Sequence, residues 1–302
     1  MRFPLPLTLG TAQLGMDYGV INWSGQPSQE EAQQIVAGSW ALGIRCFDTA
    51  QAYGESEAVL GRCLGTLPGR EEARVITKLH PRITPDNSDE ILVSVIRSLK
   101  RLGIRRLWGL MIHDESHLDQ WTGRFGLTLC DLQTQGVTEH LGVSVYSVER
   151  ALQALQIPAL DILQIPSNVF DRRFLRAGVF RRAMELKKTV FVRSVFLQGL
   201  VFPNENGLTD EFAFGRRAVH AYRDYCGLAG VSPCAFALSY ALQRFWPATF
   251  VLGAETNQQI TNTVENLENV MSFPLETSEW DKRWPQDDPL LVNPALWPLK
   301  HQ

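Results

Sequence analysis

Short apolar runs alternate with helical patterns along most of this 302-residue chain. The runs are nearly continuous, without polar residues at every second position, which is typical of parallel strands that are buried on both faces. We predict a first strand within the apolar stretch 5–14, ending in the region 10–13, and further strands at residues 44–47, 74–79, 107–112, 141–145, 162–165, 190–195 and 249–252. Amphipathic or buried helices are predicted between them, at residues 28–42, 56–64, 91–102, 147–155, 176–187, 233–244 and 257–270.

Glycines mark points at which the chain turns from helix into strand. Gly43, Gly103 and Gly136 each stand directly before an apolar run. Glycine adopts the left-handed conformation that closes a helix without the steric cost that other residues meet. At the start of the first helix, Ser28 and Glu31 have the spacing of a capping box. Helix, glycine and strand therefore form a repeated unit.

Eight strands, each followed by helical sequence, predict a (β/α)8 TIM barrel. We expect a single domain in which residues 1–273 form the barrel. The segment 274–302 contains three tryptophans and several prolines, which is too irregular for another repeat. It is expected to pack on the barrel as a C-terminal extension, not as a separate domain. The alternative, an open doubly wound sheet, lacks the G-x-G-x-x-G motif after the first strand.

Composition and charge narrow the classes of partner. A net charge of −3 with a pI near 6.1 leaves no basic excess for a phosphate backbone, so neither nucleic acid nor an anionic membrane surface is expected. The charge-free stretch 225–243 is broken by glycines and a Ser-Pro pair, and it is predicted as a buried helix instead of a membrane span. Five scattered cysteines without a C-x-x-C pair predict a reducing, cytoplasmic location.

Four polar residues lie at or just beyond the ends of consecutive predicted strands. Asp48, Lys78 and His113 end apolar runs, and Tyr53 lies in the loop after Asp48. In a barrel the carboxyl ends of the strands gather at one face, so these side chains are expected to meet. A lysine at a buried strand end needs a partner, and we predict that Asp48 pairs with Lys78.

This group of side chains suits the reduction of a carbonyl. We expect the Lys78 ammonium to lower the pKa of Tyr53, so that the phenol gives its proton to the carbonyl oxygen as a general acid. A neutral His113 would donate a hydrogen bond to the same oxygen, where negative charge builds up as hydride reaches the carbon. A nicotinamide must supply the hydride, since no side chain can do so.

At these residues the sequence resembles the aldo-keto reductase superfamily. The segments F-D-T-A-Q-A-Y-G-E-S-E, V-I-T-K-L and L-M-I-H-D match its Asp, Tyr, Lys and His tetrad in order, spacing and strand context, and the likeness extends over residues 9–269. The resemblance implies a (β/α)8 barrel and NAD(P)H-dependent reduction of an aldehyde or ketone to an alcohol. It implies catalytic roles for Asp48, Tyr53, Lys78 and His113.

The same resemblance implies a site for the nicotinamide cofactor. Ser144 and Gln164 match residues that hold the nicotinamide amide, although Val145 stands where asparagine is usual. Arg193 replaces a tyrosine that stacks on the ring, and a guanidinium plane can also stack on an aromatic ring. The full set of implied cofactor residues is Gly10, Thr11, Asp48, Ser144, Gln164, Arg193, Ser194, Phe196, Gly199, Gly253, Gln259 and Thr263.

Residues 253–263 match the segment that contacts the adenosine phosphate. Members of the superfamily that prefer NADPH often carry Lys or Arg there for the 2′-phosphate, but residues 253–259 contain neither. Glu255 would suit the ribose hydroxyls of NADH. Following the habit of the superfamily, we expect NADPH, with NADH as the alternative.

Aromatic residues in the loops are expected to shape the substrate pocket. Tyr18 and Trp23 lie in the loop 15–27, and Trp121 lies in the loop 114–125. The aromatic and amide side chains of these loops suit a small-molecule carbonyl substrate, either a simple or a sugar-derived aldehyde or ketone. Nothing in the sequence indicates an oligomeric state.

Other functions are open at the level of sequence. The same fold could serve as a nicotinamide-nucleotide sensor or regulatory subunit with weak turnover, or a barrel hydrolase or lyase could pair Asp48 with Glu55 or Glu57. His113 and His117 have the spacing of a zinc motif, but a strand end followed by a loop does not place them on one helix face, so no metal is expected. A P-loop is not supported, since no G-K-[ST] follows the glycine pairs.

Overall fold

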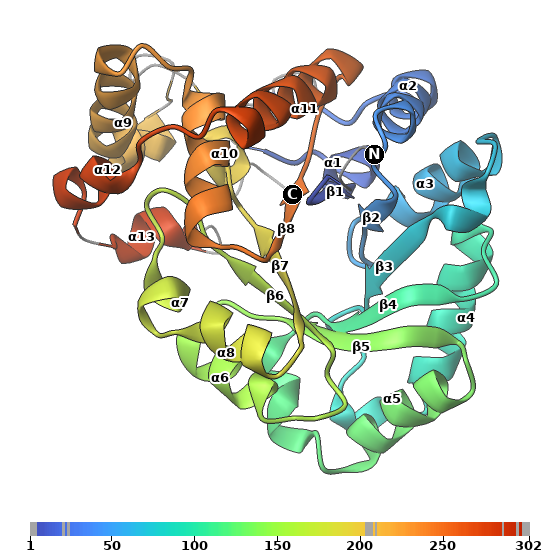
Figure 1. Ribbon diagram of the computed structural model, residues 1–302. Coiled ribbons are helices and arrows are strands. Elements are labelled where there is room, and N and C mark those ends of the chain that lie inside the picture. Colours follow the sequence, from blue (N-terminus) through green and yellow to red (C-terminus); the bar gives the residue numbers. More distant parts are fainter. Residues whose placement is uncertain are drawn as a thin grey trace.

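The computed structural model describes residues 5–19, 22, 25–202, 208, 210–285, 287–293 and 296–297. Within these residues, parallel strands close into a barrel in which each strand pairs with the next and β8 pairs with β1 (Figure 1). The predicted (β/α)8 fold is confirmed. The strands are β1 (Leu7–Gly10), β2 (Cys46–Asp48), β3 (Arg74–Lys78), β4 (Leu107–Ile112), β5 (Thr138–Ser144), β6 (Ile162–Pro166), β7 (Thr189–Arg193) and β8 (Thr249–Leu252).

Helices surround the barrel and follow its strands in sequence. They are α1 (Ala12–Gly15), α2 (Gln29–Ala41), α3 (Ser56–Gly65), α4 (Glu90–Leu102), α5 (Arg124–Thr134), α6 (Val148–Leu155), α7 (Arg173–Arg176), α8 (Val179–Glu185), α9 (Arg216–Leu228), α10 (Pro233–Arg244), α11 (Asn257–Ser272), α12 (Ser278–Arg283) and α13 (Pro289–Val292). The Ser28 capping box is present, and Gly43, Gly103 and Gly136 have positive φ as predicted.

Several elements differ from the sequence prediction. The first strand ends at Gly10, and residues 12–15 form α1, because the chain turns where the Thr11 amide donates to the Asp48 carbonyl. The sequence prediction also omitted α5, α9 and the short helices α7, α12 and α13. Both α5 and α9 begin after a glycine, Gly123 and Gly215, and therefore have no capping side chain that would mark their start in the sequence.

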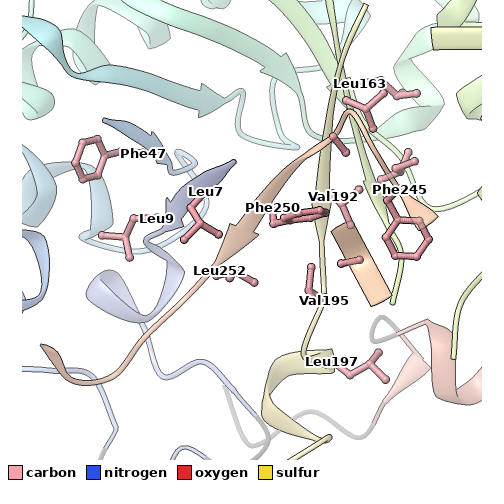
Figure 2. Close-up of a cluster of buried hydrophobic side chains, with 14 of the residues drawn as sticks. Leu7, Leu9, Phe47, Leu163, Val192, Val195, Leu197, Phe245, Phe250 and Leu252 are labelled. Atoms are coloured by element: carbon pink, nitrogen blue, oxygen red, sulfur yellow. The ribbon is translucent and has the colours of Figure 1, made fainter. Parts of the chain in front are cut away.

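The strands present two apolar faces. Residues facing the helices, including Leu9, Phe47, Leu163 and Phe250, form the main core (Figure 2). A second, smaller layer inside the barrel consists of Ile76, Met111, Ile162 and Phe191. Because side chains alternate between the two faces of a strand, residues two positions beyond this layer also point into the barrel.

The predicted buried helix in the charge-free stretch is α10, whose residues 236–241 are buried. Among the described residues no single helix is long and apolar enough to cross a membrane. Only the segments Phe212–Leu228 and Pro233–Arg244 taken together meet the criteria of length and composition, and they are bent by 93° relative to each other.

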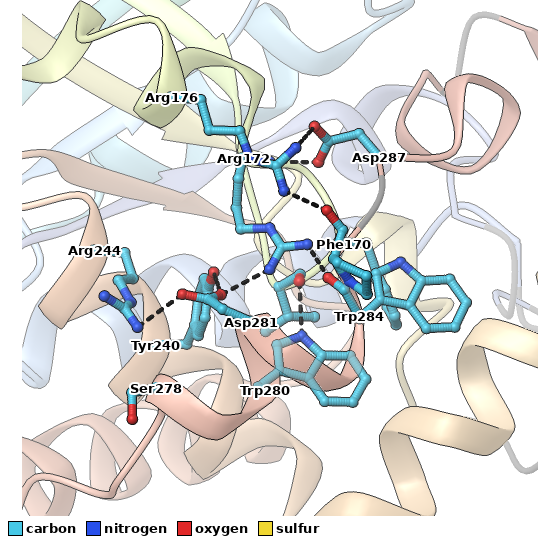
Figure 3. Close-up of polar contacts among 12 residues, drawn as sticks. Phe170, Arg172, Arg176, Tyr240, Arg244, Ser278, Trp280, Asp281, Trp284 and Asp287 are labelled. Carbon is cyan, nitrogen blue, oxygen red and sulfur yellow. Dashed lines mark hydrogen bonds and ion pairs between the residues drawn. The ribbon is translucent and has the colours of Figure 1, made fainter.

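The segment beyond α11 is anchored by aromatic and polar contacts (Figure 3). The fully buried Trp280 donates its indole N–H to the Val169 carbonyl at 2.8 Å. Arg172 is 3% exposed and donates to Asp281 at 2.8 Å and to the carbonyl of Trp284. These contacts join α12 to the loop that follows β6.

Substitution Trp280→Ala tests the prediction that this segment belongs to the same folding unit as the barrel. Removing a fully buried indole should lower the free energy of unfolding by about 3 to 5 kcal/mol, in a single cooperative urea transition. Phe273→Ala is the control, since that ring is 77% exposed, and should change stability by less than about 0.5 kcal/mol. A separate early transition, lost in Trp280→Ala, would show that the segment unfolds independently.

Candidate active site

The upper layer of the barrel interior is polar. Asp48, Lys78, Gln164 and Arg193 follow Cys46, Ile76, Ile162 and Phe191 by two positions, and these four lie in or pack against the inner apolar layer. The alternation of side chains therefore aims all four polar groups into the barrel at the carboxyl ends of their strands. The carboxyl ends of β2, β3, β6 and β7 thus contribute to one site.

A buried ion pair lies at the centre of this site, as predicted. The Lys78 ammonium lies 2.6 Å from Asp48 Oδ2 and donates to the Thr49 carbonyl at 3.1 Å. The other oxygen of Asp48, Oδ1, accepts from the Gln164 amide at 2.8 Å. Lys78 also lies 3.4 Å from the Tyr53 hydroxyl. Both carboxylate oxygens are thus engaged, and the lysine is directed at the phenol.

Two glycines place the Tyr53 loop, and the sequence analysis did not identify this role. The Glu55 amide donates to the Gly15 carbonyl at 3.2 Å. A methyl group on Gly15 would come within 2.1 Å of the Tyr53 carbonyl oxygen, and one on Gly54, at φ +51°, would come within 2.2 Å of the Gly15 carbonyl oxygen. The two backbones can approach this closely only without side chains.

A cluster of buried hydroxyls fixes the same loop to β1. Ser56 Oγ donates to the Thr11 carbonyl at 2.7 Å and also lies within hydrogen-bond distance of the Thr11 and Thr49 hydroxyls. Thr11 in turn donates its hydroxyl to the Asp48 carbonyl at 3.0 Å. The Thr11 side chain, which the resemblance assigned to the cofactor, is therefore fully buried in contacts within the protein.

His113 faces Tyr53 edge-on. The two ring centroids are 5.7 Å apart at an angle of 87°. Burial, together with the positive charges of Lys78 and Arg193, lowers the pKa of His113 to about 3. The imidazole is therefore neutral near pH 7, as we predicted. Its Nδ1 is buried without a hydrogen-bond partner among the described residues.

The prediction that the pKa of Tyr53 is lowered is wrong. Burial raises the pKa of the Tyr53 hydroxyl well above its usual value, and the Asp48 carboxylate raises it further, whereas Arg193 opposes the shift. The charge of Lys78 is already balanced by Asp48 at 2.6 Å, so burial dominates. Tyr53 consequently keeps its proton, which is the form that a general acid requires.

Polar groups suited to an amide ligand lie at the ends of β5 and β6. Ser144 is the last residue of β5, and its hydroxyl has no hydrogen-bond partner within the described part of the chain. Gln164 donates its side-chain amide to Asp48, while its side-chain oxygen makes no hydrogen bond to any described residue. Together they offer one hydroxyl and one acceptor to the carboxamide of a nicotinamide.

The segment after β7 has an unusual backbone. Ser194, Leu197, Gln198 and Gly199 all have positive φ, which is rare for residues other than glycine. The amides of Val195 and Phe196 donate to no acceptor among the described residues. Strained conformations with unpaired amides are common at ligand sites, and this segment includes Ser194, Phe196 and Gly199 of the implied cofactor set.

In the segment after β8, unlike the segment after β7, most polar groups make hydrogen bonds within the protein. The Gln13 amide donates to the carbonyls of Gly10 and Ala254 at 3.1 and 2.8 Å, and a methyl group on Gly253 would approach Gln13 Oε1 within 2.8 Å. Gln259 accepts from the Glu255 amide, and the Thr263 hydroxyl donates to the Gln259 carbonyl. Residues 256–259, at the start of α11, are all exposed.

The predicted substrate residues have different positions. Tyr18 is 38% exposed, and the charges of Asp48 and Arg193 act on its hydroxyl, which places it near Tyr53. Trp121 is half-buried and packs beside Gly126, on the side of α5. Trp23 lies outside the described residues. The sequence analysis missed the role of Tyr146, whose ring lies 4.0 Å from the Arg193 guanidinium.

The carboxylate pair of a hydrolase or lyase is not formed here. Glu57 is buried, but it accepts from Thr77 at 2.7 Å and from Arg101 at 2.7 Å. Glu55 is exposed at the start of α3. In the described chain, no group of three or more His, Cys, Asp or Glu residues is arranged to hold a metal ion, and His117 is buried in the short helix Glu115–Gln120.

Comparison with known proteins gives relatives that span most of the chain. A D-threo-aldose 1-dehydrogenase of Pseudomonas sp. is 24% identical over 87% of this chain and 92% of its own length. An aldo-keto reductase of Mycolicibacterium smegmatis is 32% identical over a shorter region, 41% of this chain and 44% of the relative. A solved structure of a proposed aldo-keto reductase from Pseudomonas aeruginosa has the same fold, with a TM-score of 0.67, 24% identity and coverage of 88% and 90%.

The family model for the aldo/keto reductase family matches residues 6–282. That range contains the whole barrel and the first helix beyond it, α12. Members of the family are oxidoreductases that act on carbonyl groups and generally bind nicotinamide cofactors. With a match over nearly its whole length, the chain belongs to the aldo/keto reductase family.

Proposed function

We propose that the protein reduces an aldehyde or ketone to an alcohol with NADPH and that Tyr53 is the general acid. The observation that carries this proposal is the convergence of Tyr53, His113 and the Lys78–Asp48 pair at one end of the barrel. A sensor or regulatory subunit would not need a protonated phenol beside a neutral imidazole. The substrate is a small-molecule carbonyl, and a sugar-derived compound is suggested only by the aldose dehydrogenase among the relatives.

The site divides the work between its residues. Tyr53 donates its hydroxyl proton to the carbonyl oxygen, and His113 donates a hydrogen bond to that oxygen through Nε2. The Lys78 ammonium, held by Asp48, then stabilises the phenolate that Tyr53 becomes. When bound, the reduced nicotinamide supplies the hydride to the carbonyl carbon. Ser144, Gln164 and the segment 194–199 would hold the cofactor by the groups that the protein leaves unpaired, with Gly253, Gln259 and Thr263 beside its adenosine end.

Substitution Tyr53→Phe tests the role of the phenol. It removes only the hydroxyl, so kcat for carbonyl reduction should fall by about 10² to 10⁴-fold, the usual contribution of a general acid. The dissociation constant for NADPH, measured by fluorescence titration, should change less than threefold. Tyr225→Phe makes the same change on α9, where the ring packs against Phe236 and Trp280, and as the control it should leave kcat within twofold. Reduction at an undiminished rate by Tyr53→Phe would exclude Tyr53 as the acid.

The neutral state of His113 can be observed directly. Because its pKa is lowered to about 3, its ring resonances should not titrate between pH 5 and 8 in NMR spectra of the protein. Assignment uses His113→Gln. A midpoint above pH 5 for the assigned resonance would contradict the proposed hydrogen-bond donor.

The cofactor preference can be measured by titrating the protein with each nucleotide. We expect NADPH to bind more tightly than NADH in a fluorescence titration. Gln259→Arg adds a guanidinium at the exposed start of α11, and it should strengthen NADPH binding about tenfold while leaving NADH binding within threefold. Tighter binding of NADH by the unmodified protein would reverse the assignment of cofactor.

A further inference from the structure

Arg193 is a half-buried cation without a matching anion. Its guanidinium lies on the Tyr146 ring at 4.0 Å and makes one long hydrogen bond, 3.4 Å, to the Val145 carbonyl. No carboxylate among the described residues forms an ion pair with it. In contrast, the most buried arginines nearby, Arg172 and Arg173, are each paired with an aspartate.

The charges around the site do not balance. Lys78 and Asp48 neutralise each other. The nearby Glu115 carboxylate accepts from the amides of Tyr146 and Ser147, at 2.6 and 3.4 Å, and forms no ion pair with Arg193. Among the described residues whose side chains point into the upper layer of the barrel, Asp48, Lys78, Gln164 and Arg193, the charge of Arg193 therefore has no direct counter-charge. A partly buried charge of this kind is stabilised when a ligand brings the opposite charge.

Arg193 also lies near the proposed catalytic residues. It ends β7, one interior position above Phe191, and its charge acts on Tyr53, His113 and Tyr18. Tyr146 covers one face of the guanidinium and fixes the orientation of its plane. Of its five N–H donors, only one is used within the described structure. The remaining donors present the fork geometry that binds a carboxylate or phosphate.

We propose that Arg193, held by Tyr146, binds an anionic group of the substrate, so that the protein reduces aldehydes or ketones that carry a carboxylate or a phosphate. This inference rests on the proposed carbonyl reduction. It differs from the stacking on the nicotinamide ring that the family resemblance implies for this position. Stacking would affect the cofactor and every substrate alike, whereas an anion site affects only charged substrates.

The test compares 4-carboxybenzaldehyde with its methyl ester, which differ in charge but have the same reacting group. The unmodified protein should have a kcat/KM at least tenfold higher for the acid. Arg193→Met keeps the apolar stem and loses the donors, and its loss of kcat/KM should be at least ten times larger for the acid than for the ester, mainly through KM. Arg193→Lys should recover part of the loss.

A second pair of substrates and a control variant complete the test. Comparing kcat/KM for glyceraldehyde 3-phosphate with that for glyceraldehyde shows whether a phosphate can take the place of the carboxylate. Arg105→Met removes one positive charge, as Arg193→Met does, but it lies just before the start of β4 and not at the carboxyl end of a strand. It should leave the ratio of kcat/KM between acid and ester unchanged. Equal losses with acid and ester in Arg193→Met, together with weaker NADPH binding, would overturn the inference in favour of stacking.

Calorimetric titration separates this inference from the proposed function. If the protein reduces neither aldehyde, binding of 4-carboxybenzaldehyde that is lost in Arg193→Met would still support the anion site while the carbonyl reduction fails. Absence of binding, or equal binding of acid and ester by the unmodified protein, would overturn the anion site itself.

Discussion

The Asp48–Lys78 ion pair is the interaction on which the rest of the site depends. Lys78 is fully buried, and a charge in that position is tolerated only with a close counter-charge and further hydrogen bonds. Asp48 meets both needs, and its second oxygen accepts from Gln164 on β6. One carboxylate thus joins β2 and β3 to β6 through the barrel interior, and this arrangement directs the ammonium at Tyr53.

Burial shifts the pKa values of Tyr53 and His113 in opposite directions, and both shifts keep the side chain neutral. It raises the pKa of Tyr53 and lowers that of His113, because it disfavours the phenolate in one case and the imidazolium in the other. Both side chains are therefore neutral hydrogen-bond donors near pH 7. Lys78 is balanced by Asp48, whereas Arg193, at the end of β7, forms no ion pair with any described residue.

The segment beyond α11 is connected to the site through the loop after β6. Trp280 and Asp281 hold residues 169–172 of that loop. Asn168, in the same loop, donates to the Ser194 carbonyl at 3.1 Å, and the Ser167 amide donates to the Arg193 carbonyl at 3.2 Å. Contacts from the loop after β6 therefore stabilise the strained backbone that follows β7. They explain why Ser194 can keep a positive φ.

The sequence by itself determined what depends on near neighbours and on charge. The barrel and most of its elements were predicted from the apolar runs, the capping box at Ser28 and the glycines before strands. The pairing of Lys78 with Asp48 was predicted from the cost of burying a charge. The chemistry of the strand ends, and then the family resemblance, predicted the roles that we propose for Tyr53 and His113. The helices α5 and α9 were missed because each begins after a glycine, without a capping side chain to mark its start.

Only the tertiary structure decided how residues from distant segments act on one another. The close approach of Gly15 to Gly54, the stacking of Tyr146 on Arg193 and the connection from Trp280 to the β7 loop each join parts of the chain that no local pattern relates. The sign of the Tyr53 pKa shift belongs to the same class. Sequence shows that an ammonium is near the phenol, but the balance between that charge, its counter-ion and burial is fixed by distances that exist only in the folded barrel.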